Sequence, residues 1–286
     1  IAYNYNNPVD PAAFEREAKA ILAEVEKECG WMYETDHVVD GRVQVKTDVD
    51  GTMTPVKGRI NYTVWSDVFV CPHCSGEIVF WEAAVDQAEG KVRDEFPCPH
   101  CSATTTKRSL ERAWEFVHDE ALRETVRRAK QVPVLINYSV GKKRFEKKPD
   151  EGDLDLIEQI EMKRIPYWYP TDELPDGEKM SDPKNAGITH VHQFYTKRNL
   201  WILGAIWTRF QNLEDTRMTA ICQFALTAAN RLFSRMSKLG TTYYFKGGGG
   251  AVNAGLLGTL YVPSFPAENN VLRTMELRIQ KLHKCM

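Results

Sequence analysis

Cys71-Pro-His-Cys74 and Cys98-Pro-His-Cys101 are two copies of one tetrapeptide, separated by 23 residues. A Cys-x-x-Cys turn places two thiols on one side of a tight loop, and two such loops facing each other complete a tetrahedral sulfur shell. The small residues Ser75-Gly76 and Ser102-Ala103 follow the pairs and allow backbone amides to turn back toward the sulfurs. The spacing therefore predicts a structural zinc site of the zinc-ribbon type, with ligands Cys71, Cys74, Cys98 and Cys101.

A disulfide or a redox-active dithiol is the alternative use of these cysteines. An oxidising Cys-x-x-Cys pair lies at a helix start in a βαβ unit, whereas both copies here follow strand-like segments. His73 and His100 could each replace a thiolate as ligand. Because four thiols already satisfy a zinc ion, we expect both histidines to be exposed residues of the loops.

The composition is that of a soluble globular protein, with 286 residues and 43% hydrophobic content. This length suits two domains, or one domain with an insertion. No apolar run reaches the length of a membrane span. Cys29, Cys222 and Cys285 are isolated, which indicates a reducing compartment, and we expect the cytoplasm. The chain starts at Ile1 without methionine or a signal-like segment, so we expect a piece of a longer protein.

Hydrophobic periodicity predicts an α+β fold. Asp10-Pro11 caps a helix that runs to Gly30, and β-rich segments then alternate up to Phe96, including a strand at 78–81. Beyond them we expect strands at 125–140 and 143–148, a helix at 153–162, an irregular connection at 166–187, a buried hairpin of helices at 196–210 and 214–236, a flexible loop at 247–250, a strand at 257–262 and a final helix at 269–282.

Four segments follow from this order. Residues 1–30 form a first helix, 31–148 a β-rich insertion with the zinc ribbon at 71–101, 149–187 an acidic Pro-rich connection, and 188–286 the helical hairpin, Gly-rich loop, strand and last helix.

Charge is distributed unevenly although the net charge is −2. Twelve Lys and Arg face six Asp and Glu between 107 and 148, and the sign reverses between 150 and 182, with eleven acidic and three basic residues. Phosphate contact is one interpretation of the basic cluster, and a solvated hairpin whose lysines protect an edge strand is the other. The cluster flanks a hairpin expected at 132–139 and contains Arg127, Arg128, Lys130, Lys142, Lys143, Arg144, Lys147 and Lys148.

No catalytic residue can be assigned from the sequence. The run Gly247 to Gly250 lacks the strand and helix context of a phosphate-binding loop. His190 and His192 have no third metal ligand in register, which favours capping or core roles ahead of the helix expected at 196.

Three segments together resemble a known family. They are Ile1-Ala-Tyr-Asn-Tyr-Asn-Asn-Pro-Val-Asp10, the two Cys-Pro-His-Cys loops, and the segment 182–201, which contains Phe194-Tyr-Thr-Lys-Arg-Asn-Leu200. The family is that of zinc-ribbon-containing bacterial DNA modification methylases, in the adenine-N6 or cytosine-N4 amino-methyltransferase group.

The resemblance implies an internal segment of such an enzyme. In the family, the S-adenosylmethionine loop lies upstream of the segment like Ile1 to Asp10, and the catalytic Asp-Pro-Pro-Tyr motif lies downstream of the last helix. No Asp-Pro-Pro or Asn-Pro-Pro followed by an aromatic residue occurs here. We therefore expect a central, DNA-engaging and target-recognising segment that is inactive alone. Its expected partners are double-stranded DNA and the remainder of the methyltransferase chain. The parent protein is expected to use S-adenosylmethionine.

Two further expectations come with the resemblance. The first and last helices would flank a doubly wound methyltransferase sheet from which the zinc insertion extends. Lys197 and Arg198, at a helix start, would join the basic cluster in contacting DNA. The competing hypothesis is a stand-alone zinc-ribbon adaptor that binds protein or RNA, with the buried helices as an oligomerisation core.

Overall fold

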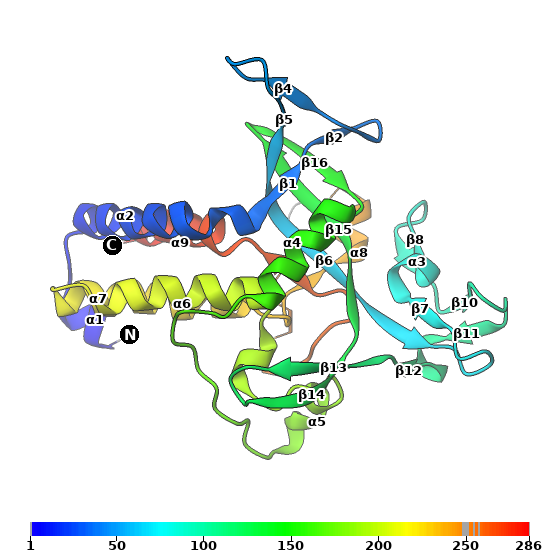
Figure 1. Cartoon of the computed structure of the whole chain (residues 1–286). Coiled ribbons are helices and arrows are strands. Elements are labelled where there is room, and N and C mark those ends of the chain that lie inside the picture. The colour runs from blue at the N-terminus through cyan, green and yellow to red at the C-terminus, as the bar shows by residue number, and fades with distance from the viewer. Residues whose placement is uncertain (1, 248–251, 254, 257, 286) are drawn as a thin grey trace.

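Four long helices form one side of the molecule (Figure 1). The computed structural model describes residues 2–247, 252–253, 255–256 and 258–285. The helices α2 (Pro11–Cys29), α6 (Lys197–Gln211), α7 (Thr216–Phe233) and α9 (Val271–Cys285) pack against one another, and the short α1 (Ala2–Asn6) contacts α7. As expected, Asp10 caps α2, since its carboxylate accepts from the Ala13 N–H, and Pro11 occupies the first turn.

The main hydrophobic core lies between these helices and the adjoining end of the sheet. Its fully enclosed side chains come from segments far apart in the sequence and include Phe14, Tyr138, Phe210, Phe233 and Met275. The periodic apolar residues that predicted the first helix all lie in this core, so burial of one helix face accounts for the pattern. Among the described residues, no helix combines the length and the hydrophobicity needed to cross a lipid bilayer.

One long strand, β6 (Lys57–Val70), organises the sheet. It pairs with five strands, and β16 (Lys143–Lys147) extends the sheet beyond β15. The five partners are β1 (Glu34–Asp36), β7 (Glu77–Val79), β12 (Glu111–Arg112), β15 (Gln131–Val140) and β19 (Ala267–Asn269). All strand pairs within the described ranges are antiparallel, which agrees with an α+β fold.

Smaller elements surround this frame (Figure 1). A hairpin of β4 (Val45–Thr47) and β5 (Met53–Pro55) projects from one end of the sheet, and a cysteine-bearing lobe (residues 71–106) lies at the opposite end of β6. The remaining elements are β2 (Val38–Val39), β3 (Arg42–Val43), β4 (Val45–Thr47), β5 (Met53–Pro55), α3 (Phe80–Ala84), β8 (Val85–Asp86), β9 (Lys91–Val92), β10 (Glu95–Pro97), β11 (Thr104–Thr106), β13 (Trp114–Asp119), β14 (Glu124–Ala129), α4 (Glu151–Met162), α5 (Ser181–Lys184), β17 (Lys238–Leu239), α8 (Thr241–Phe245), β18 (Val252–Asn253) and short 3₁₀ turns at Gly30–Tyr33, Lys107–Ser109, Glu178–Met180 and Val191–Phe194.

Three sequence expectations about strands need correction. The strand expected at 78–81 ends at Val79, and Phe80 starts α3 because Phe80 and Trp81 bury their rings in a second core cluster. The segment 125–140 is two strands, β14 and β15, which separate at Lys130. Residues 258–262 form no strand, since Leu260 and Val262 pack into a small apolar cluster instead, and residues 248–250 and 257 lie outside the described residues.

A buried polar network joins the helices to the sheet. Tyr33 Oη donates to Asn199 Oδ1 (2.7 Å) and accepts from the Val271 N–H (3.0 Å), and Asn199 Nδ2 donates to the carbonyl of Asn269 (3.1 Å). The start of α6, the start of α9 and the 3₁₀ turn that follows α2 (Gly30–Tyr33) are therefore fixed to one another by hydrogen bonds inside the core.

Beside this network lies a buried ion pair. Arg198 Nη1 on α6 lies 3.4 Å from Glu268 Oε2 on β19, and each residue is 4% exposed. Glu268 also accepts from Trp65 Nε1 (3.0 Å) and Thr196 Oγ1 (2.6 Å). This set of donors explains how a carboxylate is held in the interior.

Candidate metal centre and basic residues

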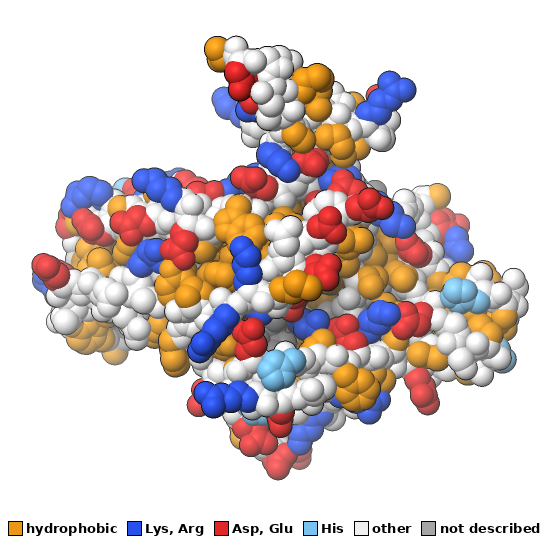
Figure 2. Space-filling model, viewed as in Figure 1, with side chains coloured by type: hydrophobic (Ala, Val, Ile, Leu, Met, Phe, Trp, Pro, Cys, Tyr) orange, Lys and Arg blue, Asp and Glu red, His pale blue; other side chains and the backbone are white. Residues whose placement is uncertain are grey.

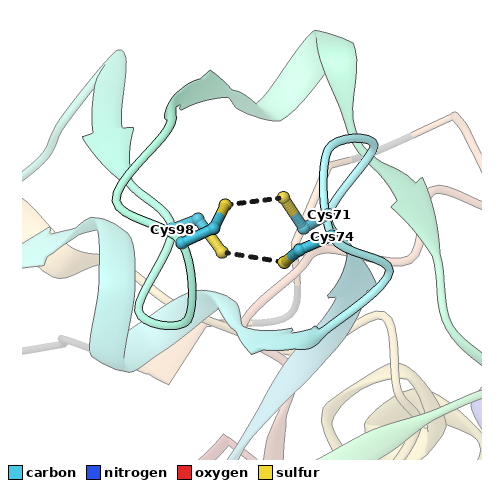
Figure 3. Close-up of side chains that lie close together, drawn as sticks. Cys71, Cys74 and Cys98 are labelled. Carbon is cyan, nitrogen blue, oxygen red and sulfur yellow. Dashed lines mark hydrogen bonds between the residues drawn. The ribbon is translucent and has the colours of Figure 1, made fainter.

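The two Cys-Pro-His-Cys loops face each other at the end of the sheet (Figure 3). Cys71 directly follows β6 and Cys98 directly follows β10. The Sγ atoms of Cys71 and Cys101 lie 3.8 Å apart, as do those of Cys74 and Cys98. All four sulfurs lie within 4.8 Å of one another. Four thiolates placed about 2.3 Å from a tetrahedral zinc ion would be about 3.8 Å apart, so the spacing fits such an ion.

The backbone builds the two loops in the same way. Ser75 and Ser102 adopt left-handed conformations, with φ of 59° and 61°. In the first loop the Ser75 N–H donates to the Cys71 carbonyl (2.9 Å), and in the second the Ser102 N–H donates to the Cys98 carbonyl (2.9 Å). These turns hold the cysteines of each pair on one side of the loop, as the small residues after each pair led us to expect.

The local amides favour a thiolate at one of the cysteines. Burial by itself raises the pKa of Cys98, but the backbone N–H groups of Cys101 and His100, together with the thiols of Cys71 and Cys101, outweigh it and bring the pKa to about 6. At Cys74 the hydrogen bond from the Gly76 N–H is outweighed by burial and by the three neighbouring thiols, which raise the pKa to about 12. Metal ions bind cysteine as the thiolate, so this environment suits a ligand.

The geometry also argues against a disulfide bond and against histidine ligands at this site. A disulfide bond needs its sulfurs about 2.05 Å apart, which the 3.8 Å separations do not approach. His73 and His100 are exposed, as expected, and His100 Nε2 lies 2.7 Å from the Glu77 carbonyl oxygen. The four cysteines can therefore hold a metal ion such as zinc with four sulfur ligands and no position open to substrate.

Two other cysteines lie in the main core. Cys29 and Cys222 are both buried, and burial raises the pKa of each thiol to about 12. They remain protonated at neutral pH and act as small apolar residues.

Most of the residues expected to contact DNA already have partners within the chain. On the face seen in Figure 2, blue and red side chains alternate instead of forming a surface of one sign. Seven of the ten candidates are engaged: Arg127 over the Trp114 ring (3.8 Å), Arg128 with Glu115 (2.6 Å), Lys130 with Glu77 (2.6 Å), Lys147 with Asp150 (2.5 Å) and Asp153 (2.9 Å), Lys148 with Glu82 (2.6 Å), Lys197 with Glu120 (3.7 Å) and Arg198 with Glu268 (3.4 Å).

Two of these seven residues are buried. The Arg198 and Lys147 side chains are 4% and 7% exposed, so neither can reach a phosphate without a rearrangement. The charge of both residues can be seen in the sequence, but their acidic partners cannot. For Arg198 the partner, Glu268, lies 70 residues away in the chain. We assign both residues to the stability of the fold.

Replacing Lys147 by glutamine is expected to destabilise the protein by about 1.5–3 kcal/mol, because Asp153 is buried and would lose a charged hydrogen-bond donor. Urea unfolding measures this change, and Lys143→Gln is the matched control because Lys143 is exposed on the same strand. Unchanged stability together with weaker DNA binding would contradict the assignment of Lys147 to the fold.

Lys142, Lys143 and Arg144 are the remaining three candidates. They lie at the tip of the hairpin formed by β15 and β16, and all three are exposed. Within the part of the chain that the structure describes, none of the three forms an ion pair.

His192, which the sequence left as a capping or core residue, is buried beside an aspartate. Its Nε2 lies 2.8 Å from Asp119 Oδ2, at the wall of a cavity of about 330 Å³. Burial of Asp119 opposes ionisation, but hydrogen bonds from His192 and Gln193 lower its pKa. No sequence signal linked these residues, since 73 positions separate Asp119 from His192.

No family model, curated protein or solved structure matches this chain.

Proposed function

We propose that this chain is the central, DNA-engaging segment of an S-adenosylmethionine-dependent DNA amino-methyltransferase. The resemblance of residues 1–10, the cysteine loops and residues 182–201 to that family supports the proposal. Two of these segments lead directly into α2 and α6, which pack against each other.

The observation that carries the DNA-engaging role is the hairpin tip. Lys142, Lys143 and Arg144 are three consecutive cations without acidic partners, whereas the other seven candidates are neutralised or held by the chain itself. Exposed cations that no carboxylate neutralises can replace the counterions of a phosphate backbone, and the release of those counterions drives binding. The tip therefore has the chemistry of a phosphate-contacting element.

The cysteine centre would serve as a rigid support in this function. β15 pairs along β6, β16 pairs with β15, and Cys71 follows the last residue of β6. A metal ion held by the four thiols would fix the Val70 end of β6, the strand along which β15 pairs, while the hairpin tip lies beside the other end of β6, where Ser139 is opposite Arg59. The zinc ion would thus stabilise structure and take no part in a chemical step.

No residue is assigned to methyl transfer. S-adenosylmethionine supplies an electrophilic methyl group where it binds, but nothing in the described residues identifies a site for it. The sequence also lacks an Asp-Pro-Pro or Asn-Pro-Pro followed by an aromatic residue. We expect the chain alone to transfer no methyl group, and the target base and recognition sequence belong to the intact parent protein.

The proposal is tested by fluorescence anisotropy of the purified chain, after zinc quantification, with labelled duplex DNA across a salt series. We expect about one zinc ion per chain and a plot of log affinity against log salt with a slope near −3, since each contacted phosphate contributes about −0.9. Absence of binding at low salt would refute the DNA-engaging role. Tighter binding to a single-stranded RNA of equal length would instead favour the adaptor hypothesis.

A further inference from the structure

A wide groove lies between α2, the sheet and the start of α9. Its volume is about 980 Å³, and six cationic and three acidic side chains line it. The cations come from α2, β6, the hairpin tip and α9, and are Lys19, Lys57, Arg59, Lys142, Arg144 and Arg273. Only Lys142 and Arg144 belong to the basic cluster visible in the sequence, so the groove is assembled by the fold.

Strand register places two of the arginines on one face of the sheet. Ser139 on β15 lies opposite Arg59 on β6 and opposite Arg144 on β16. Directly opposed residues on neighbouring strands project to the same face, so Arg59 and Arg144 flank Ser139 in one row. Gly141, with φ of 57°, makes the turn that returns the chain into this register.

Half of the groove cations are neutralised within the chain. Both carboxylate oxygens of Glu26 accept from the guanidinium of Arg59, Lys57 lies 2.6 Å from Asp36, and Lys19 lies 2.8 Å from Glu15. Among the described residues, Lys142, Arg144 and Arg273 form no ion pair. The other acids at the groove wall are Glu34 and Glu276.

Arg273 is in an unfavourable electrostatic environment. It lies in the first turn of α9, where the positive end of the helix dipole disfavours a cation. Burial lowers the pKa of Arg273, and the nearby Arg144 and Arg59 lower it further, with Glu276 as the opposing acid. Three guanidinium groups thus gather at a helix start, an arrangement that an anion would relieve.

We infer that this groove binds the phosphate backbone of a nucleic acid, with Arg144 and Arg273 as the principal phosphate contacts. Guanidinium groups recognise phosphate through paired N–H donors. The backbone N–H groups of Val271 and Arg273 already donate to Tyr33 and Asn270, so the side chains would supply the phosphate contacts. At about 980 Å³ the groove is also larger than one small anion needs. This inference rests on the proposed function and adds α9 to the DNA-contacting surface.

The test compares two arginines of the same helix. Arg273→Gln is expected to weaken binding of labelled duplex DNA about 3- to 10-fold and to reduce the magnitude of the salt slope by about 1. Arg278→Gln makes the same charge change at an exposed position outside the groove, and should change affinity less than about twofold. The double variant Arg144→Gln/Arg273→Gln should reduce the magnitude of the salt slope by about 2. Arg273→Lys keeps the positive charge and should retain most of the wild-type affinity for DNA.

The outcomes separate the two proposals. Equal effects of Arg273→Gln and Arg278→Gln would overturn the groove. The hairpin role would still stand if the wild-type chain binds duplex DNA and Lys143→Gln, at a tip position outside the groove, weakens that binding. Failure of the wild-type chain to bind duplex DNA at low salt would overturn both. Zinc content and thermal unfolding of each variant, compared with wild type, confirm that a loss of binding is not a loss of fold.

Discussion

Replacing Cys71 by serine is expected to abolish zinc binding and to unfold the cysteine lobe while the helices remain folded. A serine hydroxyl is not deprotonated at neutral pH, so the site would keep three thiolates and lose its closed sulfur shell. The regular elements of the lobe are short: β10 and β11 have three residues each and α3 has five. Structural zinc contributes about 10–16 kcal/mol in isolated zinc-finger peptides, far more than these strands can supply.

The measurement is the zinc content per chain together with limited proteolysis of residues 71–106. His73→Ala is the matched control, because His73 lies in the same loop and is exposed. We expect the control to retain about one zinc ion and to resist cleavage like the wild type. A Cys71→Ser protein with full zinc content would refute the ligand assignment.

Protection of the lobe should extend to its small aromatic core. Cys71 and Cys98 are buried in the cluster that contains Phe80 and Phe96, whose ring centroids lie 5.7 Å apart. Because the thiols and the rings share one cluster, loss of the metal should expose aromatic surface as well as the loops.

The cysteine cluster could be predicted from the sequence because its geometry is local. Each Cys-x-x-Cys turn fixes its own pair of thiols, and only the meeting of two turns had to be inferred. The helix Pro11–Cys29 was equally accessible, because its cap, its proline and its apolar period all lie within the segment. The α+β class followed from the same local patterns.

The sequence could not show which candidate DNA-contacting residues are free and which are neutralised, because their acidic partners lie far away in the chain. Lys148 meets Glu82, and Arg198 meets Glu268, across separations of 66 and 70 residues. Charge density along the chain therefore overestimated the free cationic surface. The same reasoning explains why Arg59 and Arg273 were missed, since each is isolated in its own segment and joins the groove only through strand pairing and helix packing.

Replacing Glu268 by glutamine is expected to destabilise the protein by about 3–5 kcal/mol. The variant leaves the Arg198 guanidinium buried without a carboxylate, and it weakens the acceptor shared by Trp65 and Thr196. β19, which carries Glu268, pairs with β6 in the centre of the sheet and leads into α9. Because β19 connects these elements, we expect the whole chain to unfold cooperatively at a lower urea concentration. The measurement is the midpoint of urea unfolding, with an unchanged m-value.

A double variant identifies the cause of that loss. Arg198→Met/Glu268→Leu removes both charges and keeps apolar volume, and buried ion pairs replaced in this way often cost little or even stabilise. We expect it to be at least about 2 kcal/mol more stable than Glu268→Gln, because the cost of the single change is mainly an orphaned buried cation. Glu124→Gln, an exposed strand position, should stay within about 0.5 kcal/mol of wild type. If the double variant were as unstable as the single one, the ion pair would not be the main support of β19. The hydrogen bonds from Trp65 on β6 and from Thr196 at the start of α6 would hold it instead.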